Sequence, residues 1–65
     1  MSFTLEIRIR ADLRGHVYAY WRVHKGSSLV WVRMPVYVAE RSLADGKMFK
    51  GVYRNCPVVQ HEEGK

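Results

Sequence analysis

Apolar and polar residues alternate without a break over residues 3–10, which read Phe-Thr-Leu-Glu-Ile-Arg-Ile-Arg. Successive side chains of a β-strand point to opposite sides of a sheet, so this period of two predicts a strand with one buried face. The predicted core face holds Phe3, Leu5, Ile7 and Ile9. The other face holds Thr4, Glu6, Arg8 and Arg10.

Residues 16–24 alternate in the same way, and their enrichment in Tyr and Val favours a second strand. Asp and Gly within residues 11–15 indicate a hairpin loop before it, and Gly26-Ser27 predicts a type II′ turn after it. A third strand over residues 29–34 ends before Pro35, which cannot donate a hydrogen bond to a central ladder.

The second half of the chain is less regular. Residues 36–38 are predicted to extend or restart a strand, and residues 47–54 to form a later strand that Gly51 loosens. Residues 39–45 contain good helix formers and predict one short helical turn, with a hairpin at Asp45-Gly46 as the alternative.

The predicted fold class is all-β, a small antiparallel meander of four to five strands. Val58-Val59 is predicted as a short edge strand, and the sheet is expected to be curled or to form a small open barrel. We expect a single β domain over residues 1–59 and a flexible C-terminal tail over residues 60–65.

Strand register follows from keeping apolar residues opposite apolar residues, because a slip of one residue inverts the faces. This rule places Ile9 opposite Val17 in the first hairpin and Trp21 opposite Val32 in the second. The side of the sheet away from the core is then rich in arginine and aromatic residues, with Glu6 as its acidic member. We call this predicted set the arginine–aromatic face: Arg8, Arg10, His16, Tyr18, Tyr20, Arg22, Trp31 and Arg33.

The chain has 65 residues, a formal net charge of +5 and one cysteine, Cys56. Arginine outnumbers lysine among its basic residues, and this balance favours anionic partners. The sequence shows neither a signal-peptide pattern nor a stretch of membrane-spanning length, so we expect a cytoplasmic protein that does not bind membranes.

The arginine–aromatic face predicts a non-enzymatic module that binds single-stranded DNA or RNA. Aromatic rings on a sheet stack on bases, and neighbouring arginines contact phosphates. The same residue types are enriched at protein interfaces, so the alternative is a small inhibitor or adaptor, of the phage or mobile-element type, that grips an acidic protein surface. Homodimerisation, and a purely structural role in which the arginines stack on their own aromatic neighbours, also remain open.

Catalysis and metal binding receive little support from the sequence. A ribonuclease site would draw on His16, His24 and His61 as general acid or base, beside Tyr18, Tyr20 and the arginines. However, His16 and His24 lie at opposite ends of one predicted strand, about 26 Å apart at a rise of about 3.3 Å per residue, which is too far for a shared acid–base pair. Cys56 and His61 supply two potential zinc ligands where a structural site needs four. We therefore expect no enzyme activity, no metal and no cofactor.

Overall fold

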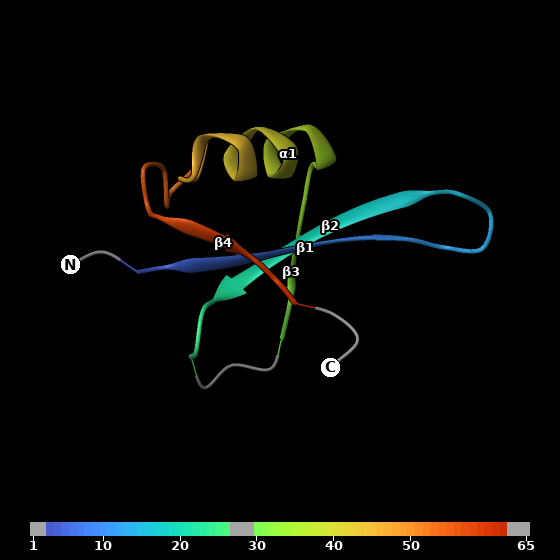
Figure 1. The fold of residues 1–65 in the computed structure, drawn as a ribbon, viewed down its shortest axis with the longest axis horizontal. Helices are drawn as coiled ribbons and strands as arrows, with labels where there is room; N and C mark the ends of the chain where they lie inside the picture. The colour runs from blue at the N-terminus through green and yellow to red at the C-terminus, as the bar shows by residue number, and fades with distance from the viewer. Residues whose placement is uncertain (1–2, 27–29, 63–65) are drawn as a thin grey trace.

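The computed structural model describes residues 3–26 and 30–62. It forms one open four-stranded sheet with a single short helix on one side (Figure 1). The elements are β1 (Leu5–Ala11), β2 (Val17–Val23), β3 (Val32–Met34), α1 (Val36–Asp45) and β4 (Val58–Gln60). The strand order is β3-β2-β1-β4, and β4 runs parallel to β1 while the other neighbours are antiparallel.

The predicted antiparallel meander of four to five strands is confirmed only for β1, β2 and β3, and the predicted register of β2 with β3 is confirmed. Ala19 pairs with Met34 and Trp21 with Val32, as the apolar-to-apolar rule requires.

The predicted type II′ turn at Gly26-Ser27 is wrong, because Gly26 lacks the positive φ that its first central position requires. The positive φ, 58°, is at Lys25, and the Gly26 N–H donates to Val23 O at 3.2 Å. Ser27 lies outside the described residues.

The predicted register of β1 with β2 is wrong by two residues. Ile9 pairs with Ala19 instead of Val17, and Val17 pairs with Ala11. The side chain of Asp12 explains the shift, because its Oδ1 accepts the backbone N–H groups of Arg14 and His16 at 2.9 Å each. These hydrogen bonds place the loop at residues 12–16. A shift of two residues keeps every side chain on its predicted face.

The core lies between one face of the sheet and α1, as the alternation predicts. Leu5, Ile7 and Ala19 are fully buried on the sheet side. The remaining buried apolar residues come from β3, α1, the loop after α1 and β4: Met34, Val38, Ala39, Met48 and Val58. Burial declines along β1 toward the hairpin loop, which projects beyond α1 (Figure 1).

The helix corrects two predictions, because residues 36–38 belong to it and it is longer than one turn. Pro35, with φ −62° and ψ 140°, ends the extended strand and leads into the first turn. Val38, Ala39 and Ser42 then face the sheet and are buried. Packing therefore overrides the strand propensity of Val36 and Val38. The helix ends at Gly46, whose φ of 76° is the left-handed conformation common after a helix.

The strand predicted over residues 47–54 is absent among the described residues. This segment forms turns, and its one β-bridge joins Lys47 to Pro57. Gly51 and Asn55 have φ values of 102° and 73°, which are incompatible with an extended strand. Inside the loop, the buried Ser42 hydroxyl accepts the backbone N–H of Phe49 at 2.7 Å and so attaches the loop to α1.

The predicted edge strand at Val58-Val59 is present as β4. Its parallel pairing with β1 makes the sheet mixed, whereas a wholly antiparallel meander was expected. Gln60 also belongs to β4, which extends the sheet one residue into the predicted tail. Residues 63–65 lie outside the described residues. Within the described residues, no helix has the length and apolar character needed to cross a membrane.

Candidate nucleic-acid interface

The arginine–aromatic face lies on the side of the sheet away from α1. Leu5, Ile7 and Ala19 point toward the helix, so the alternate residues of β1 and β2 point the other way. Residues 46–57 pack on the helix side too, where Met48, Phe49 and Tyr53 contact the core. The second half of the chain therefore leaves this face uncovered by the helix. It adds β4 at the edge, and His61 after β4 packs onto the face against Glu6 and Trp31.

Arginine and tyrosine alternate between neighbouring strands of this face. Arg8 pairs with Tyr20 and Arg10 with Tyr18 across β1 and β2, and Tyr20 pairs in turn with Arg33 of β3. The Arg33 guanidinium lies 4.5 Å from the centroid of the Tyr18 ring, a cation–π contact worth about 0.5–1 kcal/mol at an exposed site. The predicted cross-strand stacking of arginines on aromatic rings is therefore present.

Trp31 occupies the middle of the face, although it precedes β3. The Arg22 guanidinium lies 4.2 Å from the centroid of its ring, and that of Arg8 lies 5.5 Å away. The His61 ring meets the same indole in an edge-to-face contact with centroids 5.1 Å apart. Four segments of the chain thus meet at one tryptophan, which is half-buried by these contacts.

Glu6 is the buried acidic residue beneath this group, with 7% of its surface exposed. Arg22 Nε donates to its Oε1 at 3.2 Å, and His61 Nδ1 is in hydrogen-bond contact with Oε2. His24 Nδ1 lies 3.7 Å from Oε1. Burial alone would raise the pKa of Glu6, but the hydrogen bonds from His61 and Arg22 lower it below its ordinary value. The carboxylate is therefore ionised at neutral pH.

The structure adds two histidines, His24 and His61, to the site that was predicted from the sequence. His24 shares the alternation of β2, so its face was readable from the sequence. His61 arrives only through the parallel pairing of β4 with β1, where its backbone N–H donates to Ile7 O at 2.8 Å. Local alternation carries no signal for a parallel pairing between segments so far apart in sequence.

His16, by contrast, lies apart from Trp31 in the hairpin loop. Its side chain is 64% exposed, and its Nδ1 lies 3.5 Å from Asp12 Oδ2. Arg10, Tyr18 and Tyr20 lie next to this loop and, with Ala11 and Asp12, line an open hollow of about 230 Å³. The predicted site residues therefore divide into a Trp31 group and a hairpin group on the same face.

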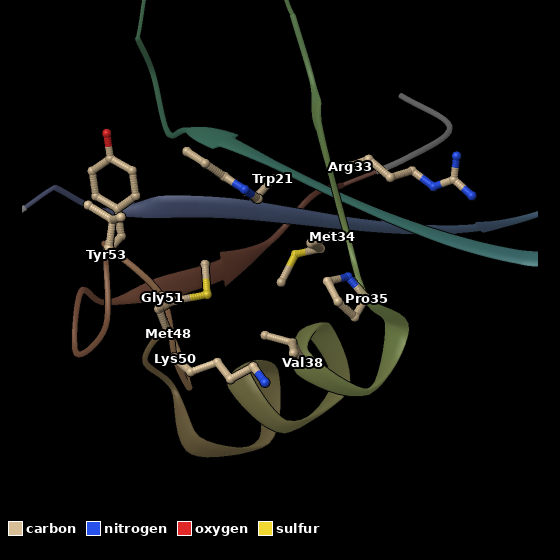
Figure 2. A pocket seen from close by; sticks show the side chains of 10 residues that line it. Trp21, Arg33, Met34, Pro35, Val38, Met48, Lys50, Gly51 and Tyr53 are labelled. Atoms are coloured by element: carbon tan, nitrogen blue, oxygen red, sulfur yellow. The ribbon is translucent and has the colours of Figure 1, made fainter.

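A second concave surface lies on the helix side of the sheet (Figure 2). It is an open groove of about 320 Å³ between α1 and the loop over residues 50–53. Trp21 and Tyr53 form one wall, with ring centroids 5.1 Å apart. The lining is mostly apolar and includes Met34, Val38 and Met48.

Neither a metal centre nor a relative identifies the site. Among residues 3–26 and 30–62, no group of three or more His, Cys, Asp or Glu side chains is placed to hold a metal ion. Cys56 is a free, partly buried thiol that packs against the core. Comparisons with protein-family models, with curated proteins and with solved structures found no match to this chain.

Proposed function

We propose that this protein binds single-stranded nucleic acid through the arginine–aromatic face. The observation that carries the proposal is the sheet face away from the helix, on which arginines of three strands alternate with aromatic rings and Arg10 and Arg33 are exposed. Glu6 is paired with Arg22 and His61, so the positive charge that the face offers a ligand comes from Arg8, Arg10 and Arg33. A flat platform of this kind suits unpaired bases better than the grooves of a duplex.

The contacts within the face indicate different roles in binding for its residues. Arg10 and Arg33 are exposed and are the main candidates for phosphate contacts, together with Arg8. Arg22 is held by Glu6 and Trp31, so it supports the platform. Bases stack on Tyr18, Tyr20 and Trp31, and the hollow beside Tyr18 and Tyr20 gives one base a place next to Arg10.

Fluorescence anisotropy with labelled single-stranded DNA and RNA tests the proposal. The double variant Arg10→Gln/Arg33→Gln is compared with Lys47→Gln/Arg54→Gln, which removes the same charge from exposed residues of the loop after α1. Loss of two phosphate contacts should weaken binding and lower the slope of log K against log salt by roughly 1.4 on single strands. Equal effects of the two variants, or no binding by the parent at low salt, would refute the proposal.

A protein partner is the second candidate, and the groove on the helix side is the observation that favours it. Its apolar wall of Trp21, Met34 and Tyr53 is the type of surface that holds a partner side chain. A pull-down after nuclease treatment separates the two candidates. A stoichiometric protein that is retained after nuclease digestion, and that is lost when Tyr53 is changed to Ser, supports this candidate. Retention of nucleic acid alone contradicts it.

Homodimerisation through an edge strand or the aromatic face stays a prediction. β3 is an edge of the sheet, and Val32 on it is 45% exposed, which is the type of edge that pairs with a second copy. Sedimentation at micromolar concentration tests it, and a monomer there would remove it.

A further inference from the structure

We infer that Glu6, His24 and His61 form a site that cleaves single-stranded RNA by intramolecular transphosphorylation. This inference rests on the proposed nucleic-acid binding and adds a reaction to it, against the expectation of a non-enzymatic module. His16 and His24 are too far apart to act together as acid and base. The fold supplies a different pair, because β4 brings His61 to the same carboxylate that His24 approaches.

The geometry gives His61 a defined orientation and places His24 beside the same carboxylate. With the Nδ1–H of His61 donating to Glu6 Oε2, its Nε2 keeps a lone pair and can accept a proton. The Nδ1 of His24 is buried, has no hydrogen-bond partner among the described residues, and lies 3.7 Å from Glu6 Oε1. One carboxylate thus faces the inner nitrogen of both rings and stabilises whichever ring is protonated.

The two histidines open onto a common hollow. It has a volume of about 370 Å³ and is lined by Glu6, His24, Val59, Gln60, His61 and Glu62. The side chains of His61 and His24 are 22% and 35% exposed, so both reach solvent while Glu6 stays buried between them. Imidazole gains and loses a proton most readily near neutral pH, as a general acid and base must.

Positive charge and a stacking surface lie beside this hollow. Trp31 contacts the His61 ring on one side and the Arg8 and Arg22 guanidinium groups on another. A base stacked at Trp31 would hold its ribose and 3′-phosphate near His61, and the arginines would stabilise the negative charge that develops on phosphorus.

The reaction needs no metal and no co-reactant. His61 Nε2 takes the proton of the ribose 2′-hydroxyl, and the 2′-oxygen bonds to the adjacent phosphorus. The bond from phosphorus to the 5′-oxygen breaks, and protonated His24 gives a proton to that oxygen. The products are a 2′,3′-cyclic phosphate and a 5′-hydroxyl. DNA lacks the 2′-hydroxyl, so it is a ligand and not a substrate.

The test uses a labelled single-stranded oligoribonucleotide in EDTA, beside the same sequence made of deoxyribonucleotides. The parent protein should cut only the RNA and leave 2′,3′-cyclic phosphate ends. His24→Ala and His61→Ala should each cut at least roughly a hundredfold more slowly. They should keep their circular dichroism spectrum and their affinity for the DNA strand. Glu40→Gln, on an exposed position of α1 and purified identically, should cut at the parent rate.

Three results would overturn the inference, and they separate it from the proposed function. Binding of both strands without cleavage refutes the reaction and leaves the binding proposal standing. Cleavage by both histidine variants at the parent rate assigns the activity to another protein and refutes the site. Absence of both binding and cleavage refutes the two proposals together.

Discussion

The Arg22 guanidinium stacks on the Trp31 ring 4.2 Å from its centroid, while its Nε donates to Glu6 at 3.2 Å. One arginine therefore links a buried carboxylate to an aromatic ring above the sheet. Trp31 lies outside β3 and has no ladder pairing of its own, so this stacking positions it. These contacts hold the ring in place without a ligand, so the proposed binding would need little further ordering of this side chain.

Replacing Trp31 should separate ligand binding from folding. Trp31→Ala removes a stacking surface worth about 1–3 kcal/mol per base, so single-strand affinity should fall roughly five- to hundredfold. Tyr37→Ala, an exposed aromatic on α1, is the matched control and should leave affinity unchanged. Anisotropy titrations measure both. Equal affinity of the Trp31 variant and the parent would remove Trp31 from the interface.

Glu6 should make the stability of the protein depend on pH in the acid range. Because its pKa in the folded protein is below the ordinary value of 4.5, the ionised group stabilises the fold above that pH. This contribution is lost as the pH falls through the lowered pKa. Urea unfolding of the parent and Glu6→Gln between about pH 6 and 3 measures it. The difference in stability should shrink toward acid, and a constant difference would contradict the assignment.

At neutral pH, Glu6→Gln should also weaken the fold directly. The change leaves Arg22 and His61 without the carboxylate that binds them. Hydrogen bonds to charged groups contribute about 1.5–3 kcal/mol, so unfolding free energy should fall by a similar amount. Glu40→Gln, at an exposed helix position, is the control and should change stability little.

Ser42 should be more important for stability than its small size suggests. Its side chain is fully buried, and its hydroxyl accepts the Phe49 backbone N–H at 2.7 Å. Ser42→Ala leaves that N–H without its partner, so we expect a loss of about 1–3 kcal/mol in denaturant unfolding. Ala44→Ser, at an exposed position of the same helix, should have a much smaller effect. A neutral Ser42→Ala would show that the loop does not depend on this contact.

Gly46 ends α1 with a φ of 76°, a conformation that disfavours residues with a Cβ. Its added Cβ would meet no atom within 4 Å, so the effect of a substitution is conformational and not steric. Gly46→Ala should lower stability by about 1 kcal/mol. Gly46→Asn should lower it less, because asparagine tolerates this region. Thermal or urea unfolding that ranks the two in the reverse order would contradict the explanation.

Strict alternation was sufficient to predict β1 and β2 and the face of their side chains. The pattern over residues 5–10 and that of β2 assigned these faces, and the apolar matching gave the β2–β3 register. The β1–β2 register depended on a side chain, Asp12, whose hydrogen bonds to the loop backbone are not encoded in alternation. An error of two residues changed the partners without changing the face.

The helix and β4 depended on contacts between distant segments. Val36-Tyr37-Val38 has strand propensity, and burial of Val38 and Ala39 against the sheet makes these residues part of the helix. His61 reaches Glu6 because Val58 pairs with Leu5, a contact across most of the chain. The contacts of Glu6 with His24 and His61 therefore could not be predicted from local patterns, although Glu6 and Arg22 were correctly placed on one face.

The parallel pairing of β1 with β4 has a consequence for how the protein reaches its native state. Contacts between Leu5 and Val58 close a loop that includes nearly every other element, whereas the β1–β2 hairpin needs only a short one. The hairpin can thus form early, and until residues 58–60 dock, one side of β1 is an open edge of unpaired backbone groups. Every chain at that stage exposes the same unpaired edge of β1. The β4 segment of one chain can therefore pair with β1 of another, and we expect this exchange to be the main route to misassembly.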